Sequence, residues 1–121
     1  MDKVQAYHSF WSSFAIPAYD ETTVPDGAVL PYITYNVLTS GFEDSLYPTA
    51  SIWYKGTSWA DITAKTEEIS AAIGFGGTLV PYDGGTIWIK RGQPFAQRLS
   101  DTDSLIRRVM LNLEIEFIEG E

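Results

Sequence analysis

His8 is the only histidine in the chain, and there is no cysteine. A catalytic base and nucleophile would therefore have to combine His8 with a serine or threonine. Triads of this kind are recognised in space, so spacing alone does not exclude one, but no Gly-x-Ser-x-Gly nucleophile turn is present. A metal site with several imidazole or thiolate ligands is impossible. A lone helical histidine more often packs against its neighbours than catalyses.

The carboxylates do not form the pattern of a metal or hydrolytic site. Asp101 and Asp103 alternate in a polar stretch, but the rest of a calcium loop is missing. Glu114 and Glu116 share one face of a predicted strand, but a glycosidase also needs a cleft between its acids. The run Gly-Phe-Gly-Gly at 74–77 lacks the Lys-Ser/Thr of a phosphate-binding loop, and it follows a predicted helix instead of preceding one. The sequence therefore predicts no catalytic residue, no metal site and no cofactor.

Aromatic residues are the more unusual feature, with four tryptophans and seven tyrosines. Most should lie in the core, but a two-layer domain leaves one face of its sheet uncovered, so some should be exposed. Tyr, Trp and Arg are favoured at protein interfaces. We interpret the segment 90–98 as a docking loop whose subunit-interface candidates are Arg91, Gln93, Phe95, Gln97 and Arg98. Its cations suit the acids of a neighbouring copy, in a head-to-tail contact that can close into a ring.

The net charge of −8 and the pI near 4.4 argue against a DNA-coating role, because an acidic surface repels phosphates. The excess acid could serve solubility, or it could line a surface over which DNA slides without binding. The length fits one domain over residues 1–121. No apolar run approaches the roughly 20 residues that span a bilayer, and residues 1–5 do not resemble a signal peptide. We therefore expect no membrane association.

A small set of elements must position the interface candidates. Hydrophobic periodicity predicts helices over residues 2–15 and 59–73, with an exposed connection over 17–30. Residues that favour β-structure predict strands over 32–38, 50–55, 78–82, 86–91 and 108–117. In the last strand the apolar side chains alternate onto one face, at Val109, Leu111, Leu113, Ile115 and Phe117. This order predicts an α+β fold, a mainly antiparallel mixed sheet of about five strands with two helices packed on one face.

Local signals refine these elements. Ser58 and Asp61 resemble a capping box at the start of the second helix, and Gly74 is a natural cap at its end. Pro81 lacks a ladder donor and should lie at the edge of the sheet or at a bulge. Residues 92–95 should end the strand that precedes them. The buried stripe of the first helix should comprise Val4, Tyr7, His8, Trp11 and Phe14.

The order of segments resembles tail-terminator and tail-completion proteins of long-tailed bacteriophages. The stretches that carry the resemblance are 31–35, 52–54 running into 58–59, 84–92 with 94–97, and 107–109. They are a pattern of strands, turns and aromatic residues and include no chemical signature. Members of that family are small proteins with a mixed sheet flanked by helices, and they form hexameric rings at the head-proximal end of the tail tube.

The resemblance implies a mechanical role in the virion tail or neck, after assembly in the host cytoplasm. A ring of copies of this chain would cap the tail tube protein, stop further growth of the tube, and offer its other face to the head–tail connector protein. Genomic DNA would pass through the lumen without specific binding. Glu43 and Asp44, between two predicted strands, are candidates for the lumen lining.

Other functions stay open on the sequence. A head–tail connector, neck or minor capsid protein would share this architecture and form a ring of different symmetry or a decoration. A small-ligand binding domain would use its aromatic residues as a pocket and stay monomeric. A hydrolase would use His8 as its base.

Overall fold

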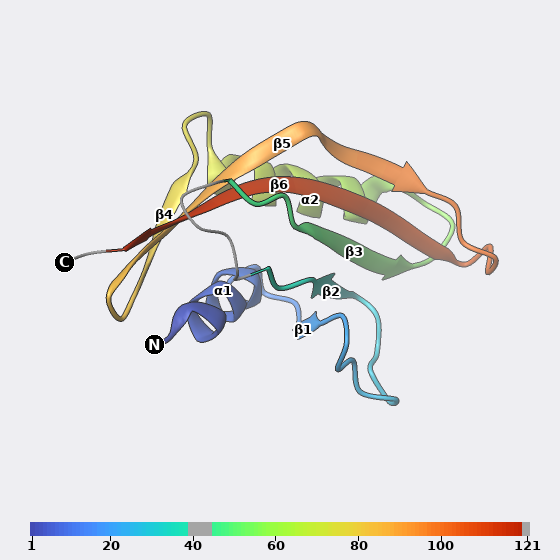
Figure 1. The fold of residues 1–121 in the computed structure, drawn as a ribbon. Helices are drawn as coiled ribbons and strands as arrows, with labels where there is room; N and C mark the ends of the chain where they lie inside the picture. The colour runs from blue at the N-terminus through green and yellow to red at the C-terminus, as the bar shows by residue number, and fades with distance from the viewer. Residues whose placement is uncertain (39–44, 120–121) are drawn as a thin grey trace.

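The computed structural model describes residues 1–38 and 45–119. Within them the chain forms two helices and six strands (Figure 1). In chain order these are α1 (Lys3–Ser12), β1 (Ala18–Asp20), β2 (Tyr32–Tyr35), β3 (Thr49–Lys55), α2 (Ala60–Ile73), β4 (Thr78–Tyr82), β5 (Gly85–Leu99) and β6 (Ile106–Glu119). The predicted α+β class is confirmed.

One mixed sheet contains all six strands, in the order β1-β2-β3-β6-β5-β4. Only β1 and β2 pair in parallel, so the sheet is mainly antiparallel as predicted. The prediction of about five strands was slightly low, because β1 lies inside the segment 17–30 that we expected to be a connection. Its three residues pair only with β2, and so short a strand carries no periodicity of its own.

The core lies on one face of this sheet. The predicted alternation of β6 is confirmed, since four of its five apolar residues are buried and Phe117 is half-buried. Neighbouring strands add fully buried isoleucines at the same face, namely Ile33, Ile52, Ile87 and Ile89. Each such side chain contributes roughly 1.5–3 kcal/mol of favourable burial.

Both helices cover that face, as predicted. Figure 1 shows the long strands β5 and β6 arching over the molecule, with α2 behind them and α1 below. Trp11 of α1 stacks on Tyr35 of β2, with ring centroids 6.5 Å apart. The segment that follows α1 also reaches α2, because Lys65 Nζ of α2 donates to the carbonyl oxygen of Phe14, 2.7 Å away.

The first helix is rotated relative to the prediction. Tyr7, Trp11 and Phe14 are buried, but His8 is exposed and so is Val4. Successive helical residues are about 100° apart, so a stripe centred on Tyr7 and Trp11 leaves His8 at its flank. The helix begins after Asp2, whose carboxylate accepts from the backbone of Gln5 in a capping box.

The second helix begins one residue later than expected, at Ala60, and its predicted capping box is wrong. Trp59 occupies the N-cap, and the Ser58 hydroxyl accepts from the amide of Ala60 at 3.0 Å instead of from Asp61. Gly74 caps the other end as predicted, with φ of 77° and its amide bonded to the Ser70 carbonyl.

Residues 92–95 do not end their strand, which corrects the prediction. β5 runs for 15 residues, and its register against β6 shifts between Arg91 and Ala96. The shift is a β-bulge that absorbs Pro94, which has no amide to donate. Because β6 is itself 14 residues long, it offers backbone partners to both halves of β5. Pro81 lies on the edge strand β4, as predicted.

Replacing Leu111 by alanine should lower the free energy of unfolding by about 2–5 kcal/mol, because the fully buried side chain leaves a cavity at the centre of the sheet. Urea denaturation measures the loss. Leu79→Ala on β4 is the matched control, since that leucine is 62% exposed and its removal should change stability by less than about 0.5 kcal/mol. Equal losses at the two positions would contradict the placement of the core.

Candidate assembly surface

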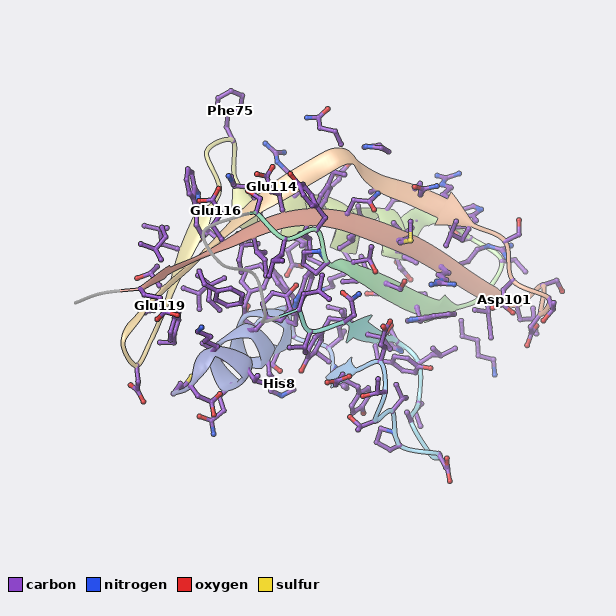
Figure 2. All side chains as sticks on the ribbon, in the orientation of Figure 1. His8, Phe75, Asp101, Glu114, Glu116 and Glu119 are labelled. Atoms are coloured by element: carbon purple, nitrogen blue, oxygen red, sulfur yellow. The ribbon has the colours of Figure 1, made fainter. Side chains whose placement is uncertain are left out.

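The sheet face opposite the helices, which we call the outer face, carries a charged network. Lys90 Nζ lies 3.1 Å from a carboxylate oxygen of Glu114 and 3.3 Å from one of Glu116. The Ser45 hydroxyl lies 2.8 and 2.9 Å from the same two carboxylates. Glu114 and Glu116 therefore share the outer face, as predicted (Figure 2). Lys90, on the neighbouring strand β5, pairs with both of them.

Glu114 is poorly suited to the role of a catalytic acid. The hydrogen bond from Ser45, and then the one from Lys90, lower the pKa of Glu114 below its ordinary value. A glycosidase acid must instead hold its proton near neutral pH, which needs a raised pKa. Glu114 is thus fixed as an anion, and the network stabilises the outer face.

The β-bulge shapes a hollow beside this network. A side chain at Gly92 would place its Cβ 2.8 Å from the backbone of Asn112, so only glycine fits where the two strands meet. The Asn112 amide donates to the Pro94 carbonyl oxygen at 2.9 Å and holds the bulge in place. The bulge hollow has a volume of about 440 Å³, and its lining comprises Phe75, Gly76, Trp88, Lys90, Arg91, Gly92, Gln93, Phe95 and Glu114.

Three of the five predicted interface residues meet at this hollow. Arg91, Gln93 and Phe95 all line it, with Gln93 exposed and Phe95 packed partly against the core. The Arg91 guanidinium donates to the Ser70 hydroxyl at 2.8 Å. These residues belong to a bulged strand, so the interpretation of 90–98 as a loop is wrong, and whether they dock a partner stays a prediction.

The other two predicted residues lie farther along β5. Gln97 is exposed opposite Met110. Arg98 pairs with Val109 and so returns to the helix side of the sheet, where its guanidinium lies 4.5 Å from the centre of the Trp59 ring. Among residues 1–38 and 45–119, no carboxylate lies within 4 Å of Arg98. The lumen candidates Glu43 and Asp44 lie outside the described residues.

Phe75 is a prominent surface residue that the sequence interpretation missed. Its side chain is fully exposed at the tip of the turn between α2 and β4 (Figure 2). The turn is braced, because Trp88 Nε1 donates to the Gly76 carbonyl oxygen at 2.9 Å. We call this feature the Phe75 knob. The signal available in the sequence was a single aromatic residue enclosed by three glycines.

A second hollow lies on the other side of the molecule, along α1 and β1. This helix groove has a volume of about 780 Å³, and its lining includes Val4, His8, Ser9, Ala18, Tyr19 and Asp20. His8 Nδ1 lies 2.6 Å from the Tyr35 hydroxyl, and His8 Nε2 lies 3.1 Å from the Ser12 hydroxyl.

The His8 contacts do not form a hydrolytic triad. A triad needs an anionic third member that stabilises the imidazolium, and Tyr35 occupies that place. Burial raises the pKa of the Tyr35 phenol, so it stays neutral. The contacts instead join α1 to β2 beside the groove.

Residues 1–38 and 45–119 lack two further features. No three His, Cys, Asp or Glu side chains there converge as a metal site. Neither helix among these residues has the length and apolar content that a membrane span requires.

Comparison with solved structures finds a likeness over nearly the whole chain. A chain in the virion of a native gene transfer agent (GTA) particle superimposes with a TM-score of 0.56 at 22% sequence identity, covering 98% of this chain and 87% of that one. No protein-family model matches the sequence. No curated protein matches it either. At this identity the likeness establishes a shared fold.

Gly77→Ala should disturb the Phe75 knob and lower the free energy of unfolding by about 1–3 kcal/mol. Gly77 has φ of +88°, and an added Cβ would lie 2.6 Å from Trp88 Nε1 and 2.7 Å from the Ile89 carbonyl oxygen. Thermal denaturation measures the effect. The neighbouring Gly76→Ala is the control, since no atom lies within 4 Å of its added Cβ. An equal loss at Gly76 would refute the close packing inferred at Gly77.

Proposed function

We propose that this chain is a structural virion protein, and specifically a tail terminator or tail-completion subunit. Copies of it would form a ring, expected to be a hexamer, at the head-proximal end of a phage-type tail tube. The observation that carries the proposal is the shared fold with a component of a GTA virion, which extends over 98% of the chain.

The surface supports a role in contact more than one in catalysis. Glu114 is held as an anion and so is not a proton donor, and Tyr35 is a neutral phenol that does not give His8 the anionic partner of a hydrolytic triad. Phe75, in contrast, is a fully exposed aromatic side chain on a braced turn. Exposed aromatic anchors and stacked arginines are the residues that dominate protein–protein interfaces. We infer that the protein is not an enzyme.

In the proposed ring, one face caps the tail tube protein and ends its growth, and the other meets the head–tail connector protein. DNA passes through the lumen, which acidic residues keep from binding phosphates. The net charge of −8 agrees with this role. Glu43 and Asp44 remain the proposed lumen residues.

A head–tail connector, neck or minor capsid protein is the second candidate, because the same shared fold supports any small component of such a virion. The two roles differ in what their loss does to the tube. A terminator limits the length of the tube, and a connector only joins a tube of finished length to the head.

Loss of this protein should therefore yield tubes of uncontrolled length that carry no head. The test introduces a stop codon early in the gene, and complementation by the intact gene is the control. Negative-stain electron microscopy of the particles measures tube length. Headless tubes of normal length would indicate the connector role instead. Normal, complete particles that contain no copy of this chain would refute a virion role.

Reversing Arg91 and Arg98 to glutamate should weaken self-association, because both are cations without a carboxylate partner among the described residues of the chain. Multi-angle light scattering of the assembled form should show at least about a tenfold loss of assembled mass fraction. Lys55→Glu is the control, an exposed cation on β3 that we do not assign to the interface. Circular dichroism verifies that each variant is folded. Unchanged mass in the double variant would exclude these arginines from the contact.

A further inference from the structure

The Phe75 knob presents an aromatic ring that its own subunit does not cover. Its ring is fully exposed, although the turn beneath it is held by the Trp88 hydrogen bond. A rigid aromatic side chain loses little conformational freedom when it is buried in a partner, which makes it an effective anchor.

The helix groove has the volume and the lining to receive it. Its volume of about 780 Å³ exceeds that of the bulge hollow, and its lining combines the apolar Val4 and Ala18 with the aromatic Tyr19. Figure 2 places Phe75 and His8, which lines the groove, on opposite sides of the subunit. The knob therefore cannot enter the groove of its own chain.

The charges beside the two features are complementary. Arg91 lines the bulge hollow together with Phe75, and none of the described carboxylates pairs with it. Asp20 lines the groove and has no cation partner among those same residues. Hydrogen bonds from the Thr22 amide and hydroxyl lower the pKa of Asp20, so the groove carries a fixed negative charge.

We propose that the Phe75 knob of one copy of this chain inserts into the helix groove of the next copy. The contact joins two different surfaces on opposite sides of the subunit, which is the arrangement that propagates head to tail and can close into a ring. The inference rests on the proposed function, since it identifies the surfaces through which that ring would form.

Disulfide cross-linking tests the contact directly, because the natural chain has no cysteine. Phe75→Cys and Ser9→Cys are introduced into one chain, and the assembled protein, in isolation or in purified particles, is oxidised and run on a non-reducing gel. Disulfide formation requires Cα atoms within about 7 Å, so a bond between the two sides of one subunit is excluded. We expect a ladder of covalent oligomers from the double variant. An equimolar mixture of the two single variants should stop at dimers.

A second pair of variants measures the contribution of the aromatic ring. Phe75→Ser should reduce the assembled fraction by about tenfold or more, while Leu79→Ser, an exposed leucine on the neighbouring strand, should leave it within about twofold.

Val29→Cys with Ser9→Cys is the control for the cross-linking experiment, since Val29 is 78% exposed and lies outside both proposed surfaces.

The outcomes separate this contact from the proposed function. Rings that assemble without a cross-link, or that assemble equally well with Phe75→Ser, would overturn the knob-in-groove contact and leave the ring itself intact. Covalent dimers from Phe75→Cys alone would show a knob-to-knob contact and also overturn it. Particles that lack the protein altogether would refute both.

Discussion

One-sided burial of the sheet is the constraint on which the rest of this structure depends. Both helices pack on the face formed by the odd-numbered residues of β6, and the even-numbered residues are left on the outer face. Side chains there must be stabilised by one another. Trp53 donates to the Thr34 hydroxyl at 2.9 Å, and the Arg108 guanidinium lies 4.5 Å from the centre of its ring. Part of the aromatic surplus therefore serves the outer face itself and is not available to a partner.

The bulge in β5 follows from the same constraint. β5 must pair with β6 along nearly its whole length, yet it contains Pro94, which cannot donate to a ladder. Displacing the proline from the ladder lets pairing resume at Ala96, and it opens the hollow beside Lys90. It also separates the cations of β5, since Arg91 stays near the hollow while Arg98 continues to the ring of Trp59 at the end of the sheet. Residues 90–98, whose composition suggested a single loop, thus contribute to two separate surfaces, one at the bulge hollow and one beside Trp59.

The parts of the fold that the sequence predicted are those with a local physical signal. Alternation identified the buried face of β6, and glycine identified the end of α2, because each depends on neighbours in the chain. The missed parts depend on distant partners. β1 exists only because β2 offers it a ladder, and β5 continues past Pro94 only because β6 does. The same holds for the candidate surface. Residues 91–95 were identified within one segment, but their convergence with Phe75 and Trp88 requires the tertiary structure.

The contacts within the folded chain separate two kinds of side chain. Groups that could perform chemistry are occupied internally: Glu114 by Ser45 and Lys90, and His8 by Tyr35 and Ser12. Phe75 is different, because its turn is braced by Trp88 although the ring gains no burial in the chain. Folding stability does not explain an exposed aromatic ring on a braced turn, and an aromatic side chain of this kind can anchor a partner. In the proposed ring, ordering the turn before assembly would lower the entropic cost of adding each subunit.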